Sequence, residues 1–231
     1  MKSQKPLISV VMNCFNSDKY LVDAINSVYA QTYDNWEIIF WDNHSDDNSG
    51  KIAKSYDSKL KYFYTDKTIP LYGARNKALE HCSGEFIAFL DCDDLWLPTK
   101  LEKQIPLFEN DQVGLVFSDS ITFDGKGFER NNYAQGRPQP HVGDCTAFLL
   151  KSYYLDIETV VLRKSVLNDN DIWFDNRFNI TTTHSCWRKP RIGNRICIST
   201  KSCHITIQWY PTICIMICII LIFPTRIKYC I

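Results

Sequence analysis

Short apolar runs alternate with longer amphipathic stretches through the first two thirds of the chain. Residues 7–12 and 36–41 are almost wholly apolar, which is typical of strands buried on both faces of a sheet. Between these two runs, apolar residues recur at i, i+4, i+7 and i+8, the spacing of one face of a helix. The apolar positions of that predicted helix are Leu21, Ile25, Val28 and Tyr29.

The alternation continues to about residue 163 and predicts one fold class. Strands are predicted at 60–64, 85–90, 113–118 and 157–163. Residues 121–123 and the turn at 124–127 predict a hairpin or an excursion at the edge of the sheet. Helices are predicted at about 47–56, from Gly73 to about residue 80, and after Pro98, with Pro106 kinking or ending the last one. The polar segment 128–143 is predicted to be a loop. Strands that alternate with helices predict an α/β fold with a mostly parallel, twisted sheet and helices on both faces.

The strand predicted at 85–90 stops abruptly at three carboxylates. Asp91, Asp93 and Asp94 follow it directly, and open α/β sheets bind ligands at the carboxyl ends of their strands. Three carboxylates this close repel one another unless a cation lies among them. Hard oxygen ligands suit Mg²⁺ or Mn²⁺, ions that proteins commonly share with substrate phosphates. The alternative is a solvated acidic turn at the start of the helix after Pro98.

Composition divides the chain at about residue 176. All 26 acidic residues lie in residues 1–175, whereas 176–231 holds eight basic residues, no acidic residue and six of the ten cysteines. The first part has no basic stripe, which disfavours nucleic acid as a partner. It also lacks the glycine-rich phosphate loops and the G-x-S-x-G elbow. Residues 1–6 do not resemble a secretory signal, so we expect a cytoplasmic protein with reduced thiols.

The segment 181–231 differs from the rest in character. It is rich in Ile and Cys and shows no steady period. Its apolar run at 213–223 is shorter than the roughly 20 residues that a spanning helix needs. We interpret this segment as out-of-frame translation of A/T-rich DNA. The alternative is a genuine hydrophobic tail that lies on a membrane.

Three loops at predicted strand ends, the end of the first predicted helix and the start of the helix before the fourth strand form an ordered set of motifs. They are Asn-Cys-Phe-Asn at 13–16, Ala-Gln-Thr-Tyr at 30–33, Asp-Asn-His-Ser at 42–45, Gly-Ala-Arg-Asn at 73–76 and Asp-Cys-Asp-Asp at 91–94. In this order and spacing the set resembles the family 2 glycosyltransferases, which have a GT-A fold. The resemblance covers roughly residues 6–180, and the chain after about residue 180 departs from the family.

The resemblance implies a role for five residues. Asp42 matches a carboxylate that accepts a hydrogen bond from the nucleotide base, typically uracil, and Phe15 lies where an aromatic residue lines the base pocket. Arg75 matches a basic position near the donor phosphates, where a guanidinium is well suited. Asp91 would reach the ribose or the metal, and Asp93 would be the principal metal ligand.

Each role has a structural alternative. Asp42 could cap the next helix together with Ser45, Phe15 could pack in the core, and Arg75 could pair with a surface acid. Asn16 and Asp46 are interpreted as turn formers. Two histidines without visible partners, His44 and His141, receive no role.

The catalytic base is missing from its expected place. Inverting transfer needs a group that takes the proton of the acceptor hydroxyl. In the family this carboxylate follows a segment like Phe-Asp-Asn-Arg-Phe at 174–178, but residues 181–184 are Thr-Thr-Thr-His. Asp175 lies within this preceding segment and is not expected to act as the base. His184 is a remote candidate for the proton acceptor. The catalytic residue is therefore unknown after Ile180, and we expect nucleotide and metal binding with weak or absent transfer.

These observations combine into one functional hypothesis. Residues 1–125 would be the donor-binding half, 126–180 a partial acceptor region and 181–231 the atypical tail. The chain would transfer a sugar from a nucleotide-diphosphate sugar, UDP-linked above all, to a glycan or lipid-linked acceptor, with inversion and with Mg²⁺ or Mn²⁺. It would act in the cytoplasm, including the inner face of the membrane as a peripheral protein. The alternatives are a non-catalytic nucleotide-sugar-binding remnant and a nucleotidyltransferase.

Overall fold

The computed structural model describes a defined part of the chain. The backbone is described for residues 5–111, 113–118, 121–123, 128–132, 143–144, 157–170, 173–174, 186–188, 195–197 and 218–220. Side chains are described for residues 5–111, 113–118, 157–168 and 174. Among the described residues, no helix combines the length and the apolar character required to cross a bilayer.

The central feature is a mixed sheet whose strand order is β3-β2-β1-β4-β9-β5-β13-β8. Its strands are β3 (Leu60–Tyr64), β2 (Trp36–Asp42), β1 (Ile8–Cys14), β4 (Phe86–Phe89), β9 (Val161–Arg163), β5 (Leu115–Val116), β13 (Cys218–Ile220) and β8 (Gly143–Asp144). The first four are mutually parallel, whereas β9 is antiparallel to both β4 and β5. The predicted α/β fold with a mostly parallel sheet is thus confirmed, with β9 and β8 as the strands that run antiparallel to their neighbours.

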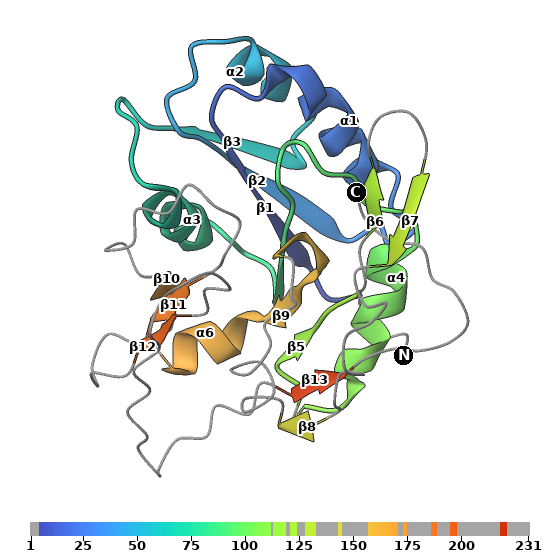
Figure 1. The fold of residues 1–231 in the computed structure, drawn as a ribbon. Helices are drawn as coiled ribbons and strands as arrows, with labels where there is room; N and C mark the ends of the chain where they lie inside the picture. Colours follow the sequence, from blue (N-terminus) through green and yellow to red (C-terminus); the bar gives the residue numbers. More distant parts are fainter. Residues whose placement is uncertain are drawn as a thin grey trace.

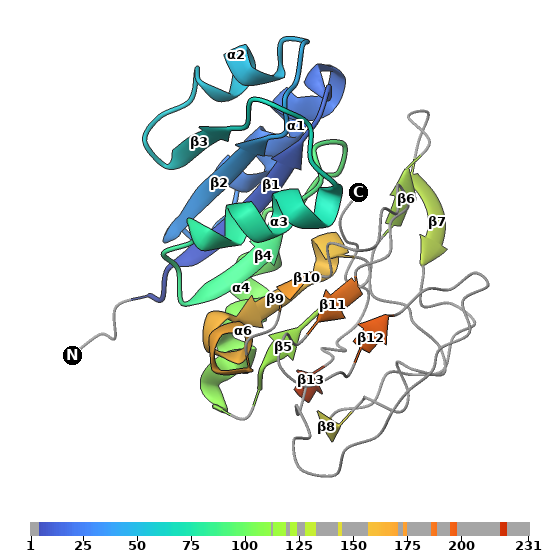
Figure 2. The same ribbon diagram turned by 90° about the vertical axis from the view of Figure 1, so that its left-hand side faces the viewer.

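Helices cover both faces of this sheet (Figures 1 and 2). The helices are α1 (Asp18–Tyr29), α2 (Ser49–Ala53), α3 (Leu71–Glu80), α4 (Lys100–Gln104) and α6 (Lys164–Asn170). Residues of α1, α2 and α4 share one hydrophobic cluster, and residues of α3 and α6 share another. Alternate β1 residues enter the two clusters, Val10 and Met12 the first and Val11 the second.

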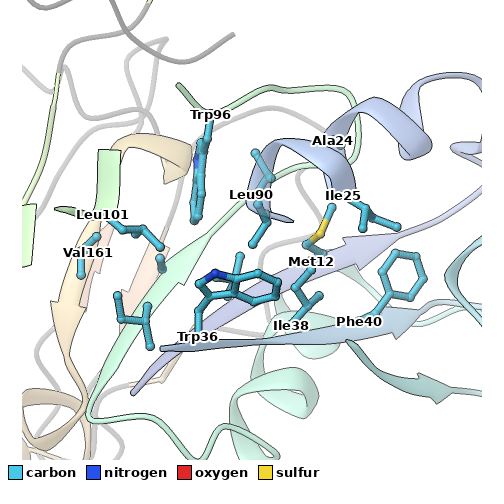
Figure 3. Close-up of a cluster of buried hydrophobic side chains, with 14 of the residues drawn as sticks. Met12, Ala24, Ile25, Trp36, Ile38, Phe40, Leu90, Trp96, Leu101 and Val161 are labelled. Atoms are coloured by element: carbon cyan, nitrogen blue, oxygen red, sulfur yellow. The ribbon is translucent and has the colours of Figure 1, made fainter. Parts of the chain in front are cut away.

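The first cluster supports the loop that follows β4 (Figure 3). Trp96, from that loop, is 3% exposed and belongs to the same cluster as Leu101 of α4 and Val161 of β9. Burying a large apolar side chain stabilises a fold by about 1.5–3 kcal/mol. The loop that carries the candidate carboxylates is therefore attached to the core through its tryptophan.

The structure shortens one predicted helix, confirms the predicted break in another and replaces the start of one predicted strand. The helix expected at 47–56 is the single turn of α2, because the chain tightens at its end, where Ser55 N donates to Ile52 O over 3.0 Å. Helix α4 passes into a 3₁₀ helix, η1 (Ile105–Glu109), which contains Pro106 and confirms the predicted break. The strand expected at 157–163 begins as a second 3₁₀ turn, η2 (Ile157–Thr159).

Two small sheets lie outside the main one. The predicted hairpin is confirmed as β6 (Ile121–Phe123) and β7 (Phe128–Asn132), which pair antiparallel. The prediction of a loop over 128–143 is therefore wrong for residues 128–132, because strand pairing uses backbone groups that a polar composition does not reveal. The other sheet contains β10 (Trp173–Phe174), β11 (Cys186–Arg188) and β12 (Arg195–Cys197).

Candidate functional site

Four of the five predicted site residues, Phe15, Asp42, Asp91 and Asp93, lie at or just after the ends of strands that finish at the same edge of the sheet, and Arg75 lies in α3. In the parallel pairing of β1 and β2, Cys14 lies opposite Asp42. In the pairing of β1 and β4, Val11 lies opposite Phe89, two residues before Asp91. The carboxyl ends of these three adjacent strands therefore bring together the motifs that the sequence separates by up to 80 residues. This edge is where open α/β sheets bind their ligands.

Asp42 is almost fully buried, and both of its carboxylate oxygens accept hydrogen bonds. Ser45 N donates to Oδ1 over 2.9 Å, and the Tyr62 hydroxyl donates to Oδ2 over 2.7 Å. Burial and this bond to Asp42 raise the pKa of Tyr62. The Ser45 contact lies within the loop and does not cap α2, whose N-cap residue is Asn48 and which has no side-chain capping hydrogen bond. The structure therefore does not bear out the capping role considered as an alternative for Asp42. Each carboxylate oxygen keeps a further lone pair, so these two contacts and a contact to a ligand are compatible.

The loops that follow β1 and β2 are joined by hydrogen bonds. Asn16 N donates to Ser45 Oγ over 3.0 Å, and Asp46 N donates to Asn16 Oδ1 over 2.9 Å. The backbone of Asn16 has a φ of 50°, in the left-handed region that Asn tolerates better than most residues. Asp47 extends the junction, since its Oδ2 accepts from Asp18 N over 2.9 Å. These contacts agree with the turn-forming roles of Asn16 and Asp46.

His44 has a partner that the sequence did not reveal. Its Nδ1 lies 2.8 Å from the Tyr64 hydroxyl, and its backbone has a φ of 72°. The interpretation of His44 as a residue without a partner is therefore wrong, because Tyr64 reaches it from the end of the adjacent strand β3. His141 lies outside the described residues.

Phe15 and Arg75 occupy opposite environments. Phe15 is 51% exposed, so it does not pack in the core as the alternative proposed. Arg75, on α3, is buried, and its Nη2 lies 3.2 Å from Oδ1 of Asp91. Its guanidinium also lies 5.5 Å from the ring centroid of Phe174. The partner of Arg75 is thus another predicted site residue and not a distant surface acid.

A cluster of three carboxylates contains Asp91 and a residue that sequence analysis missed. Carboxylate oxygens of Asp91, Asp94 and Glu158 all lie within 4.8 Å of one another. Oxygen donors in such a group fit Mg²⁺ or Mn²⁺, which also take phosphate oxygens as ligands. Asp93 lies in the same turn but is exposed and is not part of this group. Glu158 belongs to η2, more than 60 residues later in the chain, and no local pattern links it to the site.

A buried thiol also lies at this edge. Cys14 is 1% exposed, and its Sγ lies 3.9 Å from Ser45 Oγ. A hydrogen bond from Cys92 lowers the pKa of Cys14 to about 7, in spite of burial. Cys92 in turn has its Sγ 3.4 Å from the carbonyl oxygen of Asn13. These two cysteines therefore connect the loops after β1, β2 and β4.

Phe174, at the start of the segment expected to precede the base, is fixed to α3. Asn76 Nδ2 donates to Phe174 O, and Phe174 N donates to Asn76 Oδ1, both over 2.9 Å. The ring of Phe174 also stacks on that of Tyr72, with centroids 5.7 Å apart. Asp175 and His184, the two residues considered for proton transfer after this point, lie outside the described residues.

Comparison with known sequences identifies the family. The profile of Glycosyl transferase family 2 matches residues 9–170. The chain is 30% identical over 218 residues to the UDP-Glc:alpha-D-GlcNAc-diphosphoundecaprenol beta-1,3-glucosyltransferase WfgD of Escherichia coli, an alignment that covers 88% of this chain and 84% of WfgD. That coverage exceeds residues 1–180, so the alignment extends into the atypical tail.

Comparison with solved structures agrees with the family identified from the sequences. The crystal structure of S. aureus TarS in complex with UDP has a TM-score of 0.62 and 25% identity, covering 75% of this chain and 52% of TarS. The mannosyltransferase PcManGT of Pyrobaculum calidifontis, in complex with GDP-Man and Mn²⁺, has a TM-score of 0.57 and 16% identity, a likeness of fold. The chain spans about half the length of these two structures. The profile match and the likeness to WfgD over most of both chains show that this chain belongs to glycosyl transferase family 2.

Proposed function

We propose that this chain transfers a sugar from a UDP-sugar to a lipid-linked or glycan acceptor, with inversion at the anomeric carbon and with the help of Mg²⁺ or Mn²⁺. The observation that carries the proposal is the position of Asp42 and of the carboxylates of the turn 91–94 at the carboxyl edge of β1, β2 and β4. Family membership removes the nucleotidyltransferase alternative.

The nucleoside would bind between the loops that follow β1 and β2. Asp42 would accept a hydrogen bond from the base through a lone pair that Ser45 and Tyr62 leave available. Phe15, half exposed beside Cys14, would contact the flat face of the base. The UDP in the TarS structure supports the choice of a uridine nucleotide.

The diphosphate would lie beside the turn 91–94. Asp91 and Asp93 would hold the metal ion, which when bound offsets the negative charge that develops on the leaving diphosphate. Arg75 is buried and ion-paired with Asp91, and this pair fixes the direction in which that carboxylate points. Because a divalent ion shared with phosphate needs only one or two protein carboxylates, the turn provides enough ligands.

The acceptor is proposed from the relative that aligns over most of both chains. The name of WfgD specifies a GlcNAc-diphosphate linked to undecaprenol as its acceptor. A lipid-linked acceptor of this class would place the enzyme at the inner face of the membrane as a peripheral protein. The donor is proposed to be UDP-glucose or another UDP-sugar for the same reason.

A second candidate function is binding without transfer. It is favoured by the absence of any Asp or Glu after Asp175, where the family carries its base. Out-of-frame translation of 181–231 stays our hypothesis for this absence, and sequencing the gene and its transcript decides it. An uninterrupted frame in which residues 181–231 are encoded as given would contradict it.

Isothermal titration calorimetry with UDP, with and without Mn²⁺, tests the donor site. We expect Mn²⁺-dependent binding of UDP that Asp93→Asn weakens. Glu80→Gln, an exposed change at the end of α3, is the matched control and should bind as the wild type does. No metal-dependent binding by the wild-type chain would contradict the proposed function.

A further inference from the structure

We propose that Glu158 is the general base of the transfer reaction and occupies the role of the carboxylate that is missing after Ile180. This inference rests on the proposed function and adds a catalytic residue to it. It also decides between the two candidate functions above, because a chain with a base at the site is a transferase.

The sequence limits where a carboxylate base can come from. Residues 176–231 contain no Asp or Glu, so within the given sequence a carboxylate base can come only from residues 1–175. Among residues whose side chains the structure describes, one carboxylate from outside the 91–94 turn joins Asp91 and Asp94, and it is Glu158.

Two side chains, one from the loop after β4 and one from α4, hold the backbone of η2 at Glu158 and Thr159. Trp96 Nε1 donates to the carbonyl oxygen of Glu158 over 3.0 Å, and Gln104 Nε2 donates to that of Thr159 over 2.9 Å. Trp96 and Gln104 are both buried, and Trp96 is part of the core in Figure 3. The 3₁₀ turn η2 is thereby attached to the same loop that carries the candidate metal ligands.

The orientation of Glu158 follows from its neighbours. Ile157 and Thr159 are buried, at 7% and 1% exposed, whereas Glu158 is only partly buried. In a tight turn whose flanking residues enter the core, the middle side chain points away from it. The carboxylate of Glu158 accordingly comes within 4.8 Å of the oxygens of Asp91 and Asp94.

Asp42 and Asp91, two other carboxylates at this edge, already have structural or donor roles. Asp42 is buried and accepts hydrogen bonds from Ser45 and Tyr62. Asp91 is paired with Arg75. Asp91 and its neighbour Asp93 would face the metal and the leaving diphosphate, and a base must approach the acceptor hydroxyl. Glu158 lies in η2, just before β9, the strand that runs antiparallel beside β4, so it reaches the site from a separate element.

The proposed step balances as a single displacement. The acceptor hydroxyl oxygen forms a bond to the anomeric carbon while the bond from that carbon to the UDP oxygen breaks, and the electron pair leaves with UDP. The hydroxyl proton passes to a carboxylate oxygen of Glu158 and from there to solvent. General-base assistance of this kind contributes about 10²- to 10⁴-fold to the rate.

Azide separates a base from a metal ligand, because this anion attacks carbon without losing a proton. With UDP-glucose and Mn²⁺, we expect Glu158→Ala to transfer glucose to a synthetic GlcNAc-diphosphate lipid about 10²- to 10⁴-fold more slowly than the wild type. Formation of glucosyl azide and UDP should proceed at the wild-type rate or faster. Asp93→Asn should lose both reactions, and Glu80→Gln should lose neither.

Three results would overturn the assignment. All three concern Glu158→Ala. The variant could transfer glucose to the lipid at the wild-type rate, or it could lose the azide reaction as much as the lipid reaction. It could also bind UDP more weakly in the presence of Mn²⁺, which would make Glu158 a metal ligand. A wild-type chain that binds UDP-glucose but passes glucose to neither lipid, azide nor water would also overturn it, while leaving the donor site intact. Absence of Mn²⁺-dependent UDP binding would instead contradict the proposed function. Thermal unfolding of each variant excludes loss of the fold.

Discussion

Glu37, at the amino end of β2, and Asp91, beyond the carboxyl end of β4, have different kinds of neighbours. At the amino end of β2, Glu37 is buried and surrounded by donors: Lys61 Nζ at 2.6 Å, Ser9 Oγ at 2.6 Å and Ser83 N at 2.8 Å. Burial alone would raise the pKa of Glu37, but these donors lower it below its ordinary value of 4.5. Here the charge is neutralised within the fold.

At the carboxyl end, carboxylates face one another. Oxygens of Asp91, Asp94 and Glu158 lie within 4.8 Å, and the side chain of Asp91 is 34% exposed despite its pairing with Arg75. Grouping negative charges costs stability unless a cation joins them. The comparison shows that the charge of Glu37 is balanced by donors within the fold, whereas the carboxylates around Asp91 form a group that a bound cation would stabilise.

Asp93→Asn should produce the largest loss of function. The residue is exposed, so the free energy of unfolding should change by less than about 0.5 kcal/mol. Transfer should fall by about 100-fold or more, because the amide is a poorer ligand for the ion that offsets the charge on UDP. Release of UDP from UDP-glucose measures the rate, and urea unfolding measures the stability. A variant that transfers at the wild-type rate would remove Asp93 from the site.

Glu37→Gln should lower the stability of the fold and leave UDP binding unchanged. The variant loses the charge that Lys61 and Ser9 recognise, and the free energy of unfolding should fall by about 1–3 kcal/mol. The Mn²⁺-dependent affinity of UDP should stay unchanged, since Glu37 lies at the opposite end of the strand. Urea unfolding and calorimetry on the same preparation make the comparison. Weaker UDP binding without a loss of stability would break the contrast between the two ends.

Acid should destabilise the wild type more than Glu37→Gln. The folded-state pKa of Glu37 is lowered, so its stabilisation is fully present above its unfolded pKa and is lost as the pH falls through the folded value. Between about pH 6 and about pH 3, the difference in unfolding free energy between the two proteins should therefore shrink. Urea titrations at each pH measure it. A constant difference would mean that the pKa of Glu37 is not lowered in the folded state.

The smallest effect is expected at His44. Its φ of 72° strains any residue with a Cβ, and its contact with Tyr64 lies at the surface. His44→Gly and His44→Ala both lose that contact, but only glycine also relieves the strain. The glycine variant should be more stable than the alanine variant by about 1 kcal/mol. Equal thermal stabilities would show that the loop relaxes to another conformation.

Sequence patterns predicted the parts of the fold that local physics determines. The strand at 60–64 and the apolar face of α1 agree with the structure because burial imposes a period on neighbouring residues. The motif at 91–94 was found for a similar reason, as three acids directly after a buried strand. Asp42 could be placed at a strand end, but its contact with Tyr62 could not be foreseen.

Contacts between residues that are far apart in the sequence could not be predicted from local patterns. Glu158 reaches the site because β9 runs antiparallel beside β4, and no period in 157–163 encodes that neighbour. His44 meets Tyr64 only through the pairing of β2 with β3. The second strand of the hairpin, β7, was predicted to be a loop because its pairing with β6 uses backbone groups and is independent of its polar composition. Tertiary pairing, which a single sequence does not display, accounts for each of these.

A crystal structure with UDP and Mn²⁺, with the ion located by its anomalous scattering, tests the central claim most directly. The account predicts an Mn²⁺ peak beside the turn 91–94, in contact with the diphosphate, and the uracil between Phe15 and Asp42. Nucleotide or Mn²⁺ bound elsewhere, with Asp91 and Asp93 contacting neither, would contradict it.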